Sequence, residues 1–308
     1  MKNRITKVLV ITLAVVAMVS SRSALAQTFK KVNVQNKARM AQIASGGMSV
    51  WGLGTNGHPY ISRGGSFVQA STISLTQIAV GGGNLRQPDA VWAIDSAYNI
   101  YEVVKSGTTY LFNQIPGSLD FIAVGIGYQD ACHPYEVWGL NQFAEIWRYD
   151  FCAKNWSQIP GSLGWMIVSG GDVWGVNGIN QLYRFDYTSL TFKFVHLISE
   201  AGVPFAVGPG SVWALMLPSF PGEPTYVNQI LPLTGLNAEG FYPAVTQIQA
   251  GGDGVWGIDA SGQVFVLHYA DSIFVQIPGI VLSSISVGSG GGVWGIDPTG
   301  QVFAFSTP

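Results

Sequence analysis

The chain has 308 residues, of which 10% are charged and 48% are hydrophobic, and it contains 39 glycines and ten tryptophans. Its formal net charge is −2, so it lacks the basic footprint that nucleic-acid binding requires, and we expect no nucleic-acid partner. A chain of this length can bury a large core in one domain or two.

Residues 1–26 have the composition of a secretory signal peptide. Lys2 and Arg4 precede an apolar run at 8–19, and Ala24-Leu25-Ala26 has the small-x-small pattern of a cleavage site. A membrane anchor is the alternative reading of the run. Its 12 residues are fewer than the about 20 that a spanning helix needs, which favours the signal peptide.

Cleavage changes the charge of the exported chain. It would remove four of the 15 Lys and Arg residues and no acid, leaving 11 bases against 17 acids and a net charge of −6. Because of the signal peptide, and because no other long apolar run is present in the sequence, we expect residues 27–308 to form one exported domain, secreted or periplasmic, that does not insert into a membrane.

Residues 28–35 read "TFKKVNVQ", a short strand pattern that stands ahead of a long series of repeats. The last repeat ends after its third strand, at "QVFAF" (residues 301–305), and lacks a fourth. The N-terminal segment is therefore predicted to supply the outer strand of the last unit, which closes a ring and removes two free sheet edges.

The dipeptide Val-Trp marks the repeats. Successive copies of its tryptophan lie 36–46 residues apart, a period typical of repeat architectures. Each unit has four short apolar runs with alternation at period two, which predicts four antiparallel strands. We expect an all-β fold, a single β-propeller of seven four-stranded blades, or of six if the fifth unit lies outside the ring. The seven copies are Val50-Trp51, Val91-Trp92, Val137-Trp138, Val173-Trp174, Val212-Trp213, Val255-Trp256 and Val293-Trp294.

Turns of the Asp-x-x-Gly type follow several Val-Trp strands, as at 259–262 and 297–300. A calcium loop is one reading of these aspartates, but the spacing lacks the other oxygen ligands. Turn chemistry is the simpler reading, because Asp starts such a turn and Gly takes its left-handed position. We expect no metal site and no cofactor.

Two segments on one predicted face are longer than the other turns, at 81–90 and 125–136. They belong to adjacent blades, where extra length is often used for recognition, although variable segments without function are equally compatible. Cys132 lies in the second of these segments and Cys152 in the loop after the third strand of the same unit. Both loops emerge on one face, so a disulfide between Cys132 and Cys152 is predicted.

The repeat resembles the tectonin repeat of slime-mould and mushroom tectonins, horseshoe-crab tachylectin and fish egg lectins. The resemblance covers nearly all of residues 27–308 and is weakest in the fifth unit. It implies a β-propeller, commonly of six blades in that family, and several members are lectins that bind bacterial or fungal surface glycans. The residues that carry it are the Val-Trp pairs, Ile-Pro-Gly at 115–117, 159–161 and 277–279, and Val-Gly at 80–81, 124–125, 207–208 and 287–288.

The opposite face offers candidate glycan contacts. In the third and fourth units Phe121 and Trp165 stand just before the inner strand, where an aromatic ring can stack on the apolar face of a sugar. Asp120 and Asn180 are nearby candidates for hydrogen bonds to hydroxyls. The alternative is that both rings fill gaps between blades. Four other units have a polar residue at this place: Gln42, Gln77, Gln247 and Ser284.

Catalysis finds little support in the sequence. The four histidines occupy unrelated repeat positions, and no Ser/His/Asp order, metal-ligand spacing or phosphate loop is present. We expect a non-catalytic, lectin-like propeller whose partners are glycans or glycoconjugates of a cell surface or envelope. The alternative is a propeller that binds an extracellular protein, as a secreted interaction or inhibitor module.

Overall fold

The computed structural model describes residues 28–82, 87–169, 171–197, 205–208, 211–216, 226–231, 235–236, 245–268 and 273–306. The predicted signal peptide at 1–26 lies outside these ranges. Within them, no helix has both the length and the hydropathy needed to cross a membrane.

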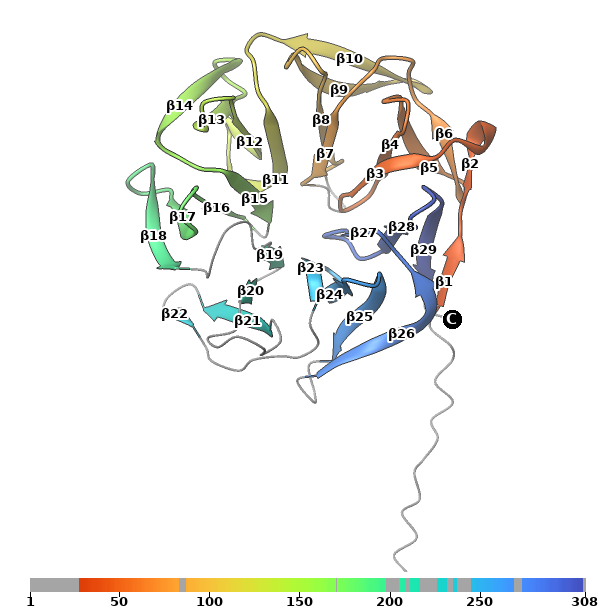
Figure 1. Cartoon of the computed structure of the whole chain (residues 1–308). Helices are drawn as coiled ribbons and strands as arrows, with labels where there is room; N and C mark the ends of the chain where they lie inside the picture. Colours follow the sequence, from red (N-terminus) through yellow and green to blue (C-terminus); the bar gives the residue numbers. More distant parts are fainter. Residues whose placement is uncertain are drawn as a thin grey trace, which may run out of the picture.

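The described strands form seven sheets, arranged as blades around a central opening (Figure 1). This confirms the all-β propeller and its seven blades, and the fifth unit stands in the ring as a blade of its own. Blade 1 contains β3 (Met40–Ser45), β4 (Val50–Gly54), β5 (Pro59–Arg63) and β6 (Ser66–Gln69); blade 2 contains β7 (Gln77–Gly81), β8 (Ala90–Ile94), β9 (Ile100–Ser106) and β10 (Thr109–Ile115). Blade 3 contains β11 (Phe121–Asp130), β12 (His133–Leu140), β13 (Glu145–Asp150) and β14 (Asn155–Ser162); blade 4 contains β15 (Trp165–Ser169), β16 (Asp172–Val176), β17 (Gln181–Asp186) and β18 (Thr191–Leu197). Blade 5 contains β19 (Phe205–Gly208), β20 (Ser211–Met216), β21 (Tyr226–Leu231) and β22 (Gly235–Leu236); blade 6 contains β23 (Val245–Gly251), β24 (Gly254–Asp259), β25 (Gln263–His268) and β26 (Ile273–Val281); blade 7 contains β27 (Ser284–Val287), β28 (Val293–Ile296), β29 (Val302–Ser306) and β1 (Thr28–Lys31).

The repeat tryptophans form the core between the blades. Six of the seven are at most 2% exposed, and the seventh, Trp294, is half-buried against Phe67 of blade 1. The first strand of each blade lies nearest the central opening (Figure 1). Its small residues suit this crowded place; for example, a Cβ atom added to Gly81 would lie 2.3 Å from the carbonyl oxygen of Val124 in the next blade.

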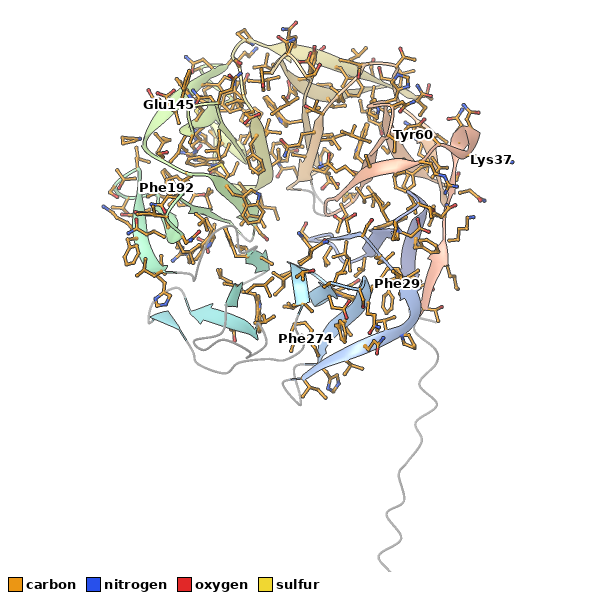
Figure 2. The ribbon with its side chains drawn as sticks, viewed as in Figure 1. Phe29, Lys37, Tyr60, Glu145, Phe192 and Phe274 are labelled. Atoms are coloured by element: carbon orange, nitrogen blue, oxygen red, sulfur yellow. A yellow bond between two sulfur atoms is a disulfide. The ribbon has the colours of Figure 1, made fainter. Side chains whose placement is uncertain are left out.

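The N-terminal segment closes the ring. Strand β1 pairs antiparallel with β29, placing Phe29 opposite Phe305, as the sequence predicts. The Phe29 ring, labelled in Figure 2, also contacts Trp256 of blade 6, with 6.1 Å between ring centroids.

A second contact of the N-terminal segment was not predicted. Strand β2 (Asn33–Val34) pairs in parallel with β6, the outer strand of blade 1, before the short 3-10 helix η1 (Gln35–Lys37) turns the chain into that blade. The segment therefore joins blade 7 to blade 1 by main-chain hydrogen bonds on both sides.

The aspartate turns are stabilised by hydrogen bonds from their own backbone N–H groups to the aspartate carboxylate. Asp259 Oδ1 accepts hydrogen bonds from the N–H groups of Ser261 and Gln263, at 2.9 and 2.8 Å, and Gly262 takes the left-handed conformation with φ of 84°. The turn reading is therefore right for these aspartates, because their carboxylates bind the backbone of their own turns.

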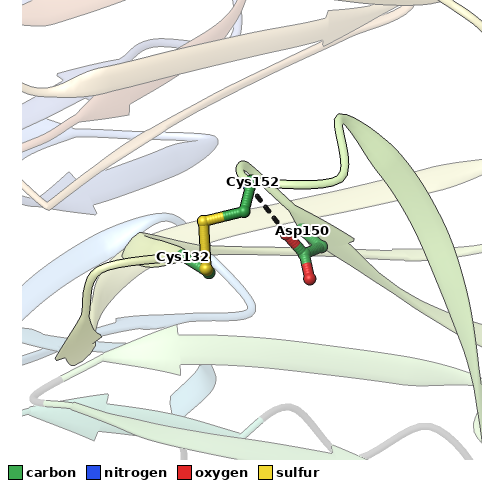
Figure 3. Close-up of side chains that lie close together, drawn as sticks. All are labelled: Cys132, Asp150 and Cys152. Carbon is green, nitrogen blue, oxygen red and sulfur yellow. Dashed lines mark hydrogen bonds between the residues drawn. A yellow bond between two sulfur atoms is a disulfide. The ribbon is translucent and has the colours of Figure 1, made fainter.

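The predicted disulfide is present. Cys132 and Cys152 lie in the β11–β12 and β13–β14 turns of blade 3, with their Cα atoms 4.9 Å apart (Figure 3). Beside them, Asp150 Oδ1 accepts a hydrogen bond of 2.8 Å from the Cys152 N–H (Figure 3). Among the described residues these three form the single cluster of potential metal ligands, and both sulfurs are bonded to each other.

Replacing both cysteines by serine is expected to lower the free energy of unfolding by about 3 kcal/mol. The bridge spans a sequence separation of 20, and the chain-entropy model gives this value for a loop of that size. Denaturant unfolding of the variant and the oxidised protein measures the difference. Thiol titration of the unfolded, unreduced protein is the control, and two reactive thiols per chain would contradict the bond.

Candidate functional site

The glutamines at the start of the inner strands clamp neighbouring blades together. The Gln42 side chain accepts a hydrogen bond from the Ile78 N–H and donates one to the Ile78 carbonyl, at 3.1 and 3.0 Å. Gln77 bonds the N–H and carbonyl of Ile122 in blade 3 in the same way, both at 2.9 Å. These side chains therefore hold adjacent blades together by hydrogen bonds. This role was not predicted from the sequence.

Phe121 and Trp165 occupy the clamp position in blades 3 and 4. Phe121 packs against the core cluster shared by those blades, which includes Met166. The Trp165 ring meets the edge of Phe205 in blade 5, with 4.8 Å between centroids. Both aromatic side chains are half-buried, and both line the central channel.

The other two predicted contacts lie apart from the channel wall. Asp120 is exposed just before β11, and its N–H donates to the Leu140 carbonyl at 2.8 Å. Asn180 holds the left-handed position of the β16–β17 turn, with φ of 61°. The structure thus brings Phe121 and Trp165 to one cavity, and neither Asp120 nor Asn180 lines it.

The channel cavity has a volume of about 280 Å³ and an uncharged wall. Its lining comes from the inner strands of all seven blades, and none of the described residues in it is charged. Two of its few polar groups, the Ser45 and Ser286 hydroxyls, bond each other at 2.7 Å. Shape and apolar contact, rather than charge, therefore decide what this cavity holds.

The opposite face carries the two long segments predicted from the sequence. Residues 125–136 are mainly a hairpin extension, because β11 runs to Asp130 and β12 starts at His133. In the other segment, residues 83–86 lie outside the described part of the chain. The two segments touch: the Tyr135 hydroxyl donates to the Pro88 carbonyl at 2.9 Å.

A larger cavity of about 690 Å³ opens beside this contact. Ligand pockets in proteins measure about 300–1,000 Å³. Residues of blades 1 and 2 supply most of its wall, and Tyr135, Phe151 and Trp294 complete it from blades 3 and 7. Sequence reasoning placed the long segments on one face but missed this cavity.

Two carboxylates line this inter-blade cavity, and they differ in their partners. Asp89 accepts hydrogen bonds from three backbone N–H groups at 47–49 and from the Ser49 hydroxyl, so its oxygens are engaged. The Glu102 carboxylate has no hydrogen bond or ion pair to any described residue. Burial raises the pKa of Glu102, and the charge of Lys154 only partly offsets the rise.

Two cations, Arg63 and Lys105, also line the cavity, and neither forms an ion pair with Glu102. The Arg63 guanidinium lies over the Tyr110 ring, 5.2 Å from its centroid, and donates to the Thr108 carbonyl. Lys105 is exposed and is three residues from Glu102 on β9, so its side chain leaves the opposite face of the strand. Glu102 therefore faces the cavity as an unpaired carboxylate.

Comparisons with solved structures find the same architecture in distant proteins. The WD40 domain of Neurospora crassa Pan2 is 11% identical, covers 92% of this chain and 96% of its own, and superposes with a TM-score of 0.63. YCF48 bound to D1 peptide is 11% identical, with 91% and 97% coverage and a TM-score of 0.64. YCF48 from Cyanidioschyzon merolae is 11% identical, covers 90% of this chain and 98% of its own, and has a TM-score of 0.62. At these identities the likeness establishes the fold alone.

Among curated proteins, no sequence match was found. The sequence model of the tectonin domain matches residues 39–183 and 244–308. These ranges hold most of the chain, and they include six of the seven Val-Trp pairs and all three Ile-Pro-Gly positions on which the resemblance rests. The chain therefore belongs to the tectonin domain family.

Proposed function

We propose that this protein is an exported, non-catalytic, lectin-like propeller that binds glycans of a cell surface or envelope. The carrying observation is the pair of aromatic side chains, Phe121 and Trp165, in the wall of the channel cavity. An aromatic ring in an uncharged wall can stack on the apolar face of a sugar. Asp120 and Asn180, on the same side of the blades, are the candidates for hydroxyl contacts.

Export and the absence of catalysis belong to the same proposal. The disulfide fits an oxidising compartment, and residues 1–26 would direct the chain there. The Asp89 carboxylate is engaged by residues 47–49 of blade 1, and the channel wall is uncharged, so neither cavity offers a pair of acid and base groups for hydrolysis.

Phe121→Ala and Trp165→Ala are each expected to weaken glycan binding by at least about fivefold, an effect on the order of 1 kcal/mol. Single sites should bind with dissociation constants of about 0.1–1 mM, and avidity should come from several sites on a repetitive surface. A glycan array on residues 27–308 selects the ligand, and calorimetry with its monovalent and multivalent forms gives the constants.

Phe143→Ala is the matched control for these variants. Phe143 lies in the β12–β13 turn of blade 3, on the same face as Phe121, and is 81% exposed, so its loss should leave binding and melting temperature unchanged. Intact glycan binding together with a large loss of thermal stability in both aromatic variants would assign Phe121 and Trp165 to packing alone.

One observation favours binding of an extracellular protein as the second candidate function. Phe143 and Ile179 take the same position in the turns of blades 3 and 4 and are 81% and 70% exposed. Adjacent exposed apolar groups suit a protein contact. No binding on the array, with one protein recovered by pull-down and lost in Phe143→Ser, would support this function instead.

A further inference from the structure

In blades 3 and 4 an arginine stands opposite the repeat tryptophan, whereas the other blades have a different residue there. Arg148 lies on β13 opposite Trp138, and its guanidinium carbon is 5.5 Å from that ring centroid. The rings of Phe185 and Tyr187 in blade 4 approach it at 5.8 and 5.5 Å. Glu136, two residues before the tryptophan, binds the guanidinium through both carboxylate oxygens. An internal cation thus sits between aromatic rings and a carboxylate.

Blade 2 has the same aromatic frame with the charges changed. Trp92 meets Tyr149 and Phe151 of the next blade, with centroid distances of 4.9 and 6.2 Å. The residue opposite Trp92 is Glu102 instead of arginine, and the place of Glu136 is taken by Ala90. Blade 2 therefore keeps the rings and a carboxylate but has no cation opposite its tryptophan.

The missing cation coincides with open space. Glu102, Ala90 and Phe151 all line the inter-blade cavity of about 690 Å³. The oxygens of Asp89 are engaged by the β3–β4 turn of blade 1, so Glu102 is the lining carboxylate with oxygens available to a ligand. Aromatic walls beside a carboxylate favour a cationic group over a neutral one.

We propose that this cavity binds a glycan through a free amino group, whose ammonium donates to the Glu102 carboxylate beside Phe151 and Tyr135. The ligand class is a sugar with unacetylated amines. This proposal rests on the proposed glycan binding and adds a second site, separate from the channel. The Ser49 and Ser62 residues in the wall offer polar groups near the remaining hydroxyls.

Two trisaccharides test the proposal, because they share a backbone and differ only in whether their amino groups are free and charged or acetylated and neutral. The probes are the β-1,4 trimer of glucosamine and that of N-acetylglucosamine, titrated into isotope-labelled residues 27–308. The amino trimer should shift the resonances of cavity residues and bind at least about tenfold more tightly than the acetylated trimer, since hydrogen bonds to charged groups are the stronger ones.

Two substitutions should change the binding of the amino trimer in opposite directions. Glu102→Gln should remove the preference for the amino trimer, whereas Lys154→Gln should strengthen binding, because it removes the cation that competes for Glu102. Ala90→Glu combined with Glu102→Arg rebuilds the blade 3 pair, fills the site and should abolish binding while the melting temperature is kept. Glu145→Gln, at the start of β13 on the other face, is the matched control and should change nothing.

The possible outcomes distinguish the amine site from the proposed glycan binding on which it rests. Glycan binding with no preference for the amino trimer, or with a preference that survives Glu102→Gln, overturns the amine site and leaves the lectin proposal standing. An array with no glycan bound overturns the lectin proposal and the amine site together.

Discussion

A chain that begins at residue 36 is expected to lose about 3–6 kcal/mol of its free energy of unfolding relative to one that begins at residue 27. The removed segment carries two buried side chains, Val32 and Val34, each worth about 1.5–3 kcal/mol by burial. It also pairs with β29 over four residues and with β6 over two. Domains are stable by only about 5–15 kcal/mol, so the loss should be severe.

Thermal melting of the two chains measures this effect, and point variants locate it. Val34→Ala should destabilise, because Val34 packs in the core cluster that contains Phe67 and Val302. Lys30→Ala, at an exposed place on β1, should not. A peptide of residues 27–35 added to the shortened chain should raise its melting temperature. Equal melting of the long and short chains would show that the ring is held without β1 and β2.

The fold could be predicted from the sequence because each blade repeats the same information. Seven Val-Trp strands gave the blade count, and the missing strand after residues 301–305 identified β1 as the closing strand. The disulfide followed from topology, since both cysteines lie in turns that emerge on one face of one blade. These inferences need only strand order, which the alternation of apolar residues supplies.

Contacts between blades could not be predicted in the same way. The parallel pairing of β2 with β6 involves two residues, too few to leave a pattern. The Gln42 and Gln77 clamps depend on the distance from a side chain to the backbone of another blade. Phe121 and Trp165 were recognised as unusual, and the structure places both at one cavity. The inter-blade cavity arises from eight separate segments and has no signal in any one of them.

The sequence also contains a charge pattern that predicts one of the contacts within a blade. An acid and an arginine stand 12 residues apart around the Val-Trp pair in two successive units, as Glu136 with Arg148 and Asp172 with Arg184. A repeat that conserves opposite charges at a fixed spacing predicts an ion pair between neighbouring strands. In the second unit Glu102, an acid, stands at the place of the arginine.

The ion pair between Glu136 and Arg148 in blade 3 is buried. Glu136 is 0% exposed and Arg148 is 8% exposed, and Glu136 also accepts a hydrogen bond of 2.6 Å from the Trp138 indole N–H. Glu136→Gln or Arg148→Met is each expected to cost about 3–5 kcal/mol, because either change leaves one buried charge without its partner. The double variant should cost less than the sum, since no unpaired charge remains.

Blade 4 provides the matched control, because the same pair is more exposed there. The side chains of Arg184 and Asp172 are 35% and 29% exposed, and the shorter aspartate leaves the Trp174 indole nitrogen without a hydrogen-bond partner. Arg184→Met should therefore cost about 1 kcal/mol or less, as solvent screens the charge that remains. A double-mutant cycle by denaturant unfolding in each blade compares the two couplings. If both pairs couple equally, burial does not set the strength of the blade 3 pair, and strand geometry common to both blades becomes the better explanation.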